Sequence, residues 1–201
     1  TRLYSGNNSG SGLAVTNNAN SGNFQPDWVW IKRRDSSGSH GLHDSNRGST
    51  KRLKSDANEA EDTNSNILAS FDSNGFTIGD NSGNYNASGT YVGWQWKANG
   101  GTTSSNTDGS ITSTVQANTT AGFSIVTYTG TGSASTVGHG LGVAPKMLIV
   151  KERDNANDWK VYHHSIGNDK TVRLDTTDAQ TSDTTTFNST TPTSSVFSVN
   201  S

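Results

Sequence analysis

The sequence predicts an all-β fold of antiparallel sandwich or barrel type, made of two tandem β-sandwich units of which the second is incomplete. Three observations support this prediction. Short runs of β-branched and aromatic residues alternate with polar turns, no stretch of a dozen residues has a helical apolar stripe, and one motif recurs later in the chain. The hydrophobic fraction is only 28%, but the net charge of −2 and the clustered aromatic residues differ from those of disordered chains.

Four segments have the residue pattern of strands. In residues 91–96 every second side chain is apolar, which is typical of a half-buried strand. Residues 123–128 are rich in β-branched and aromatic residues, and residues 28–31 and 147–150 are continuous apolar runs that favour strands covered on both faces. Turns rich in Asn, Asp and Gly separate these segments, as in antiparallel sheets.

An internal repeat predicts the division into units. Residues 26–35 align with residues 145–154 at a spacing of 119 positions, with Pro, an apolar run, Lys, Arg and Asp in the same order. We therefore expect a first sandwich at residues 1–100 and a second at residues 121–201. Between them, residues 101–120 should be a Gly/Ser/Thr/Asn linker with an edge strand near 110–115.

The same alignment indicates an unpartnered strand. The apolar runs 28–31 and 147–150 should be equivalent central strands, and Phe76 should correspond to Phe197. The first unit closes with residues 91–96, whereas the second has no counterpart within residues 121–201. We expect this strand to come from a continuation of the chain or from a neighbouring subunit, because an open sheet edge exposes unpaired backbone groups.

Catalytic motifs are missing from the sequence, which predicts a protein that is not an enzyme. There is no HExxH, GxSxG, Walker or Rossmann pattern. The His and acid groupings are His43 beside Asp44, and His163 beside His164; polar loop or strand roles also explain them. Trp159 with the two neighbouring histidines could form a platform for a sugar ring, although a single Trp in a strand is more often a core residue. These five residues are the candidate contacts to a glycan or receptor.

The composition also bears on cofactors and partners. We expect no cofactor; structural calcium is considered because Asp and Asn crowd residues 72–74 and 154–158, but neither run has the oxygen spacing of an EF-hand. An isoelectric point near 6.2 gives no general attraction to nucleic acid, and no apolar stretch is long enough for membrane insertion. Cations between residues 33 and 54 are followed by acids at 59–62, which we interpret as a solvated face.

Five strings together resemble a known family: residues 24–32, 42–45, 71–76, 91–97 and 138–145. They are similar to a repeated domain in virion structural proteins of marine tailed bacteriophages, often labelled tail fibre or concanavalin-like. The resemblance covers nearly the whole chain and carries over no catalytic residue. Gln95 stands where Cys is common in that pattern.

The resemblance implies a location on the virion surface, in an appendage, fibre or capsid decoration. The implied partners are further copies of the chain, other virion proteins and a cell-surface glycan, where multivalent display would raise avidity. Two alternatives stay open: a carbohydrate-active enzyme such as a depolymerase, and a bacterial surface adhesin or filament subunit on the same fold class.

Overall fold

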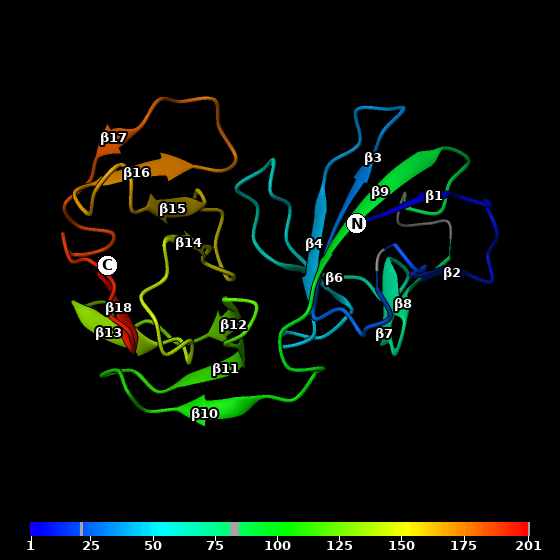
Figure 1. Ribbon diagram of the computed structural model, residues 1–201. Coiled ribbons are helices and arrows are strands. Elements are labelled where there is room, and N and C mark those ends of the chain that lie inside the picture. The colour runs from blue at the N-terminus through cyan, green and yellow to red at the C-terminus, as the bar shows by residue number, and fades with distance from the viewer. Residues whose placement is uncertain (21, 81–84, 201) are drawn as a thin grey trace.

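The computed structural model describes residues 1–20, 22–80 and 85–200. The regular secondary structure of these residues consists of β-strands without helices, as Figure 1 shows. All pairs of named strands are antiparallel, and one isolated bridge between Ile111 and Val137 is parallel. The prediction of an all-β, antiparallel fold is confirmed.

In the part of the chain that the structure describes, the strands of the first half, β1 to β9, pair with one another. One sheet has the order β1-β9-β3-β4, a second has the order β2-β8-β7, and β5 pairs with β6. Their bounds are β1 (Arg2–Ser5), β2 (Leu13–Thr16), β3 (Trp28–Arg33), β4 (Gly41–Asp44), β5 (Lys51–Arg52), β6 (Asp62–Thr63), β7 (Leu68–Asp72), β8 (Gly75–Ile78) and β9 (Thr90–Trp96).

The strands of the second half likewise pair among themselves. Their orders are β10-β11-β12, β13-β18 and β14-β15-β16-β17. Their bounds are β10 (Ser104–Asn106), β11 (Ser113–Asn118), β12 (Phe123–Thr127), β13 (Ser135–Gly138), β14 (Met147–Val150), β15 (Lys160–His163), β16 (Lys170–Arg173), β17 (Thr181–Ser182) and β18 (Val196–Val199).

A four-strand arrangement recurs in both halves with the same register. Strands β3, β4, β5 and β6 pair as β14, β15, β16 and β17 do, and each second-half residue lies 119 positions after its counterpart. The matching pairs are Trp28–Asp44 and Met147–His163, Leu42–Leu53 and Val161–Val172, and Lys51–Thr63 and Lys170–Ser182. A one-residue slip would turn every side chain to the other face, so the shared register keeps the two burial patterns alike.

The positions of β3 and β14 in their sheets differ from the prediction that both are central. Strand β3 lies between β9 and β4, whereas β14 pairs only with β15 among the described residues. The prediction is therefore correct for β3 and wrong for β14. The reason is that no described strand of the second half lies beside β14 as β9 lies beside β3.

Residues 101–120 do not form an extended linker. They contribute β10 and β11, and β11 is the central strand of the β10-β11-β12 sheet. The expected edge strand near 110–115 is therefore displaced to Ser113–Asn118 and lies inside the sheet. The pairing of β11 with β12 makes this segment part of the second half.

Each half has its own apolar core. In the first, alternate residues of β3 place Val29 and Ile31 against Phe76 and Ile78, all of them fully buried. In the second, Val137 and Phe197 belong to a smaller buried cluster with Ile111 and Val199, and the partly buried Val126, Tyr128 and Leu148 pack against it. The smaller second core is consistent with the lower number of large apolar residues buried there.

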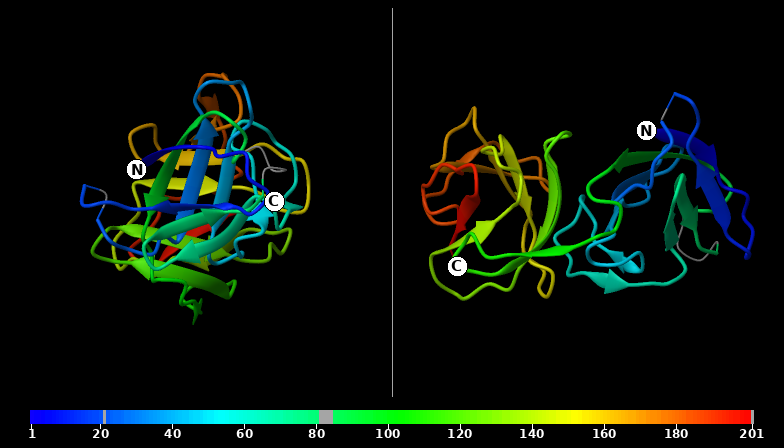
Figure 2. Two further views of the ribbon diagram at one scale, coloured as in Figure 1. Left: turned by 90° about the vertical axis from the view of Figure 1, so that its right-hand side faces the viewer. Right: turned by 60° about the horizontal axis from the view of Figure 1, so that its bottom comes forward.

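The two halves lie side by side and contact each other, as the views in Figures 1 and 2 agree. Trp28 lies opposite Trp96, and Trp30 lies opposite Trp94, so β3 and β9 place four indoles on one face. Phe123 of the second half stacks on Trp28 with ring centroids 5.5 Å apart. This tryptophan face, turned away from the first core, is a surface on which the second half packs.

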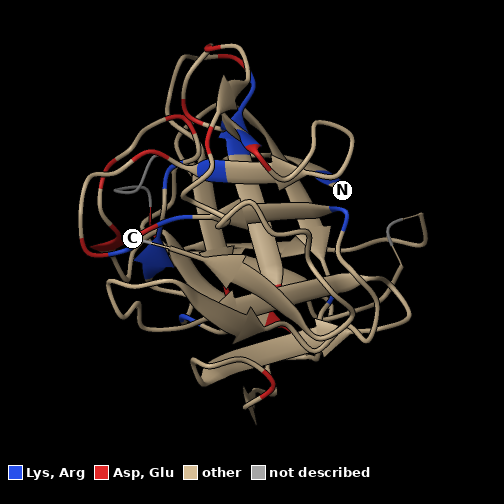
Figure 3. Cartoon of the chain, turned by 90° about the vertical axis from the view of Figure 1, so that its left-hand side faces the viewer, with Lys and Arg blue, Asp and Glu red and all other residues tan. Residues whose placement is uncertain are grey.

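Charge is distributed unevenly along the chain. Between Lys97 and Lys146 the sequence has a single charged residue, Asp108. Figure 3 shows the strands of this segment almost entirely without charged residues, whereas the loops at the opposite end carry both signs. The clusters of charge that could bind a ligand are therefore outside the β10 to β13 region.

Candidate functional site

His43, one of the candidate glycan contacts, is fully buried in β4. Its Nδ1–H donates to the Ser49 carbonyl over 3.0 Å, and its ring meets Tyr85 edge to face with centroids 6.3 Å apart. Burial lowers the pKa of His43 to about 3, and the nearby Arg47 adds to this effect. The imidazole is therefore neutral at physiological pH and has no surface to offer a receptor.

Asp44 is also buried and belongs to a chain of ion pairs. Arg47 donates its Nε to Asp44 over 2.5 Å and its Nη1 to Glu61 over 2.8 Å. Glu61 in turn accepts two bonds from Arg153 of the second half, at 2.8 and 2.9 Å. Asp44 therefore contributes to the contact between the halves and is not available as a general base.

Trp159 is 4% exposed and packs against Leu42 and Leu53 of the first half. Its Nε1–H donates to the carbonyl oxygens of Lys54 and Ala57. These two residues lie in the segment between β5 and β6 that extends toward the second half in Figure 1. The indole is an anchor between the halves, so its ring faces cannot stack on a sugar.

His163 and His164 lie apart from this contact. Their rings are 5.2 Å apart, His163 is half-buried and His164 is exposed. His163 ends β15 opposite Met147, at the position that Asp44 has in the first half. The five predicted contacts therefore do not form one site.

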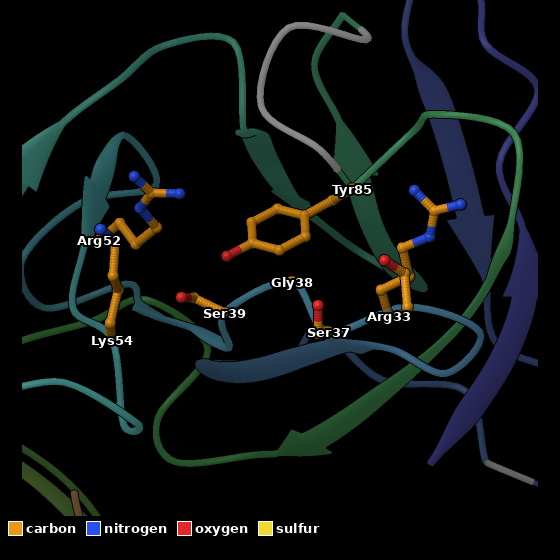
Figure 4. Close-up of a pocket in the computed structure, with 8 residues that line it drawn as sticks. Arg33, Ser37, Gly38, Ser39, Arg52, Lys54 and Tyr85 are labelled. Carbon is orange, nitrogen blue, oxygen red and sulfur yellow. The ribbon is translucent and has the colours of Figure 1, made fainter.

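A cavity of about 410 Å³ opens elsewhere in the first half, and we call it the Tyr85 pocket. It is lined by Arg33 at the end of β3, Arg52 of β5, Lys54, Tyr85 and the serine loop 36–39. Figure 4 shows the Tyr85 hydroxyl directed toward the side where Arg52 and Lys54 lie, with Arg33 across the ring. No carboxylate lines the cavity among the described residues.

The hydroxyl of Tyr85 is buried, with the Arg52 guanidinium as a donor beside its oxygen, and no described residue accepts a hydrogen bond from it. Leaving such a group unsatisfied costs about 1–3 kcal/mol. Burial raises the pKa of Tyr85 to about 12, against a smaller opposing effect of the neighbouring Arg52 guanidinium. The phenol therefore keeps its proton and is a donor directed into the pocket.

The three cations of the pocket each have a carboxylate partner on its outer side. Arg33 pairs with Asp35, Arg52 with Asp62 and Lys54 with Glu59. The cation side chains are 16% to 26% exposed and the carboxylates 41% to 60%. The carboxylates are therefore the more exposed partners, and the side chains that line the cavity itself are the cations.

The Tyr85 pocket was missed in the sequence because its parts are far apart. Arg33, Arg52 and Lys54 are in the basic stretch that we interpreted as a solvated face, whereas Tyr85 comes much later and carries no motif. The only available signal was the excess of Arg and Lys before residue 55. Nothing in the spacing indicates that these side chains converge on a tyrosine hydroxyl.

A second surface of interest is the outer edge of β14. Met147 is 50% exposed, and β14 has no strand on this side among the described residues. At the equivalent place in the first half, β9 pairs with β3 over six residue positions. The edge therefore presents backbone donors and acceptors where the first half has a ladder.

Among the described residues, no group of three or more His, Asp or Glu side chains could hold a metal ion. No helix in the part of the chain that the structure describes is long and apolar enough to cross a membrane.

Comparison with known proteins gives one match. A family model described as "Domain of unknown function (DUF7483)" matches residues 1–201. No curated protein and no solved structure matches the chain.

Proposed function

The chain belongs to the DUF7483 family, and we propose that it is a non-enzymatic structural protein of a virion, in which copies of the chain associate through sheet edges. It would form part of an appendage, fibre or capsid decoration on the particle surface. We further propose that the two halves are tandem copies of one β-sandwich unit, jelly-roll or concanavalin-like. The shared register of β3 to β6 and β14 to β17 supports this.

The unpaired edge of β14 is the observation that carries the proposal. Its counterpart β3 pairs on both sides, with β4 and β9, whereas β14 pairs on one. An antiparallel strand added to β14 would satisfy its backbone groups and cover Met147. His43 and Asp44 make contacts inside the protein, which favours a structural over a catalytic role for these two residues.

We propose that the occupant of this edge is β1 of a second copy. Strand β1 pairs only with β9 among the described residues, so its outer edge is open in every copy. Leu3 of β1 is 54% exposed, much like Met147 at 50%. Pairing Leu3 opposite Met147 would place both apolar side chains on one face and bury them together. Such a head-to-tail contact is heterologous and would extend into a filament.

Cysteine cross-linking tests this pairing, because the chain has no Cys of its own. The variants Leu3→Cys and Met147→Cys are made separately, mixed and oxidised, and the products are separated on a non-reducing gel. Residues opposite each other in a sheet lie within disulfide reach, so the mixture should give disulfide-linked pairs of the two variants. A chain that carries both cysteines should give a ladder of oligomers.

The control is Ser133→Cys, at an exposed loop position outside strands β1 and β14. It should cross-link only at the background rate in every mixture. Heterodimer yields from Leu3→Cys and Met147→Cys that do not exceed this background would contradict the pairing. A wild-type mass that stays monomeric up to millimolar concentration would contradict association altogether.

A further inference from the structure

We propose that the Tyr85 pocket binds a tetrahedral oxyanion, the sulfate or phosphate group of a larger ligand, between Arg52, Lys54 and the Tyr85 hydroxyl. This site is separate from the β14 edge and does not depend on edge pairing. None of its residues belongs to the contact set predicted from the sequence. The support comes from donor geometry, from the cavity and from a comparison of the two halves.

The donors gather on one side of the cavity. In Figure 4 the Tyr85 hydroxyl and the Ser39 hydroxyl both point toward the side occupied by Arg52 and Lys54. Lys54 gives one hydrogen bond to Glu59, which leaves two of its three N–H donors for a ligand. Arg52 donates hydrogen bonds from Nε and Nη2 to Asp62, and these bonds hold its guanidinium group at the cavity wall.

An oxyanion satisfies what the protein leaves open. The Tyr85 hydroxyl is buried beside the Arg52 guanidinium, which can only donate to it, so its proton has no acceptor among the described residues, and it remains protonated over the ordinary pH range. A tetrahedral group has several acceptor oxygens, so it can take a bond from a phenol, an ammonium and a serine hydroxyl at once. A cavity of about 410 Å³ also has room for the sugar or other group that carries it.

The second half gives an internal comparison. At a shift of 119 residues, the positions of three lining residues are occupied by residues of different charge: Arg33 corresponds to Glu152, Ser39 to Asp158 and Arg52 to Thr171. The second half nevertheless has the same four-strand register. Lys54 corresponds to Arg173, so one cation is retained, whereas the cations at the Arg33 and Arg52 positions are not required by the four-strand register. Ligand binding accounts for the presence of these two cations in the first half.

The experiment titrates the full chain with sodium sulfate and with sodium phosphate, against sodium chloride at matched ionic strength. The readouts are the unfolding temperature and the backbone amide NMR shifts of residues 36–39. Sulfate raises the stability of most proteins without saturation, so saturable shifts confined to this loop are the expected result. The variants Lys54→Gln and Tyr85→Phe should each raise the dissociation constant about tenfold, because each removes a donor to a charged group.

Lys51→Gln is the matched control, because Lys51 precedes Arg52 but does not line the cavity. Its dissociation constant should stay within about twofold of the wild-type value, as expected for a surface charge outside the site. Unchanged binding in Lys54→Gln and Tyr85→Phe, or shifts without saturation, would overturn the proposal.

Two further arms identify the source of the anion. Dextran sulfate, a phosphorylated dextran and unmodified dextran are compared in the same NMR titration. Tighter binding of the sulfated polymer than of free sulfate would assign a sulfated polysaccharide, and the corresponding result with phosphate would assign a phosphorylated one. If unmodified dextran binds as well as both, and the variants bind it equally, the oxyanion assignment fails.

Discussion

Tyr128 meets Phe197 edge to face in the second half, with ring centroids 6.2 Å apart and planes at 73°. Tyr4 and Phe76 make the same contact in the first half, at 6.2 Å and 78°. Phe76 and Phe197 lie at matching places in the paired strands β2-β8 and β13-β18. The aromatic contact is therefore repeated along with the strand register, although the loops between these residues differ in length.

We expect this contact to stabilise both halves beyond the burial of the rings. A double-mutant cycle with Tyr128→Leu and Phe197→Leu should give a coupling free energy of about 1 kcal/mol, as found for edge-to-face pairs. The cycle with Tyr4→Leu and Phe76→Leu should give a similar value. Urea unfolding of the wild type and of each variant measures both couplings. A coupling near zero in either half would show that the ring geometry adds nothing to area burial there.

Glu61 should be the most sensitive charge at the contact between the halves. Its side chain is 8% exposed and accepts bonds from Arg47 of the first half and Arg153 of the second. Burial would raise the pKa of Glu61, but the bonds from Arg153 and Arg47 outweigh it and hold the pKa below its usual range. Glu61→Gln should lower the free energy of unfolding by about 3 kcal/mol, because it removes the one carboxylate charge that buried Arg47 shares with Arg153 and leaves Arg47 with Asp44 alone.

The control for Glu61 is Glu59→Gln, which removes a carboxylate that also pairs with a cation but is 60% exposed. Its effect on the free energy of unfolding should be below about 0.5 kcal/mol, since exposed pairs contribute little. The lowered pKa of Glu61 also predicts how the stability depends on pH. Its contribution is present above the ordinary pKa of a glutamate and is lost as pH falls through the folded value. Equal losses in the two variants at pH 7 would contradict this account.

The local pattern of apolar and polar residues in the sequence predicts much of the fold but none of the Tyr85 pocket. The apolar runs at β3 and β14 and the constant spacing of 119 residues predict the repeated hairpin, because side-chain alternation and burial fix its register. The strand β11 was harder to place, since Ser113–Asn118 has few apolar residues and its position depends on pairing with β12. When a strand has few apolar residues, its own sequence does not show which strand it pairs with.

His43 and Trp159, two of the five candidate contacts, are buried, whereas His164 is exposed. Aromatic and imidazole groups suit ligands, but the same groups also suit buried contacts, and only tertiary packing decides between them. The half-to-half contact that covers Trp159 depends on Leu42 and Leu53, more than a hundred residues earlier. Convergence of Tyr85 with Arg52 and Lys54 depends on the same kind of long-range placement.

Asp27 should be essential to the junction of β3, β4 and the chain that follows β9. It is fully buried, and its carboxylate accepts bonds from the Ser45 hydroxyl and from the backbone N–H groups of Ala98, Gly100 and Gly101, at 2.6 to 2.9 Å. Asp27→Asn replaces an acceptor oxygen with an NH₂ group that faces other donors. We expect a loss of about 3 kcal/mol in urea unfolding.

Asp35→Asn is the comparison for Asp27, because Asp35 is 42% exposed and pairs with Arg33 at the surface. This change should cost below about 0.5 kcal/mol. If Asp27→Asn were as mild as Asp35→Asn, the four donors would have to find other acceptors, and the junction would not depend on the carboxylate.

His43 should make the protein sensitive to mild acid. Burial holds the pKa of His43 at about 3 in the folded chain, whereas an unfolded histidine titrates near 6.5. The folded pKa is the lower one, so the unfolded state takes up a proton first as pH falls. The stabilising contribution is complete above about pH 6.5 and is lost progressively as pH falls toward 3, by at most about 1.4 kcal/mol per pH unit. The Cε1–H resonance of His43 should therefore not shift between pH 7 and 4, while the free energy of unfolding falls.

His43→Gln is the control, because glutamine cannot titrate. Its free energy of unfolding should fall less steeply with pH, by up to about 1.4 kcal/mol per pH unit. Identical slopes in the two proteins, or a His43 resonance that titrates above pH 5, would contradict the prediction.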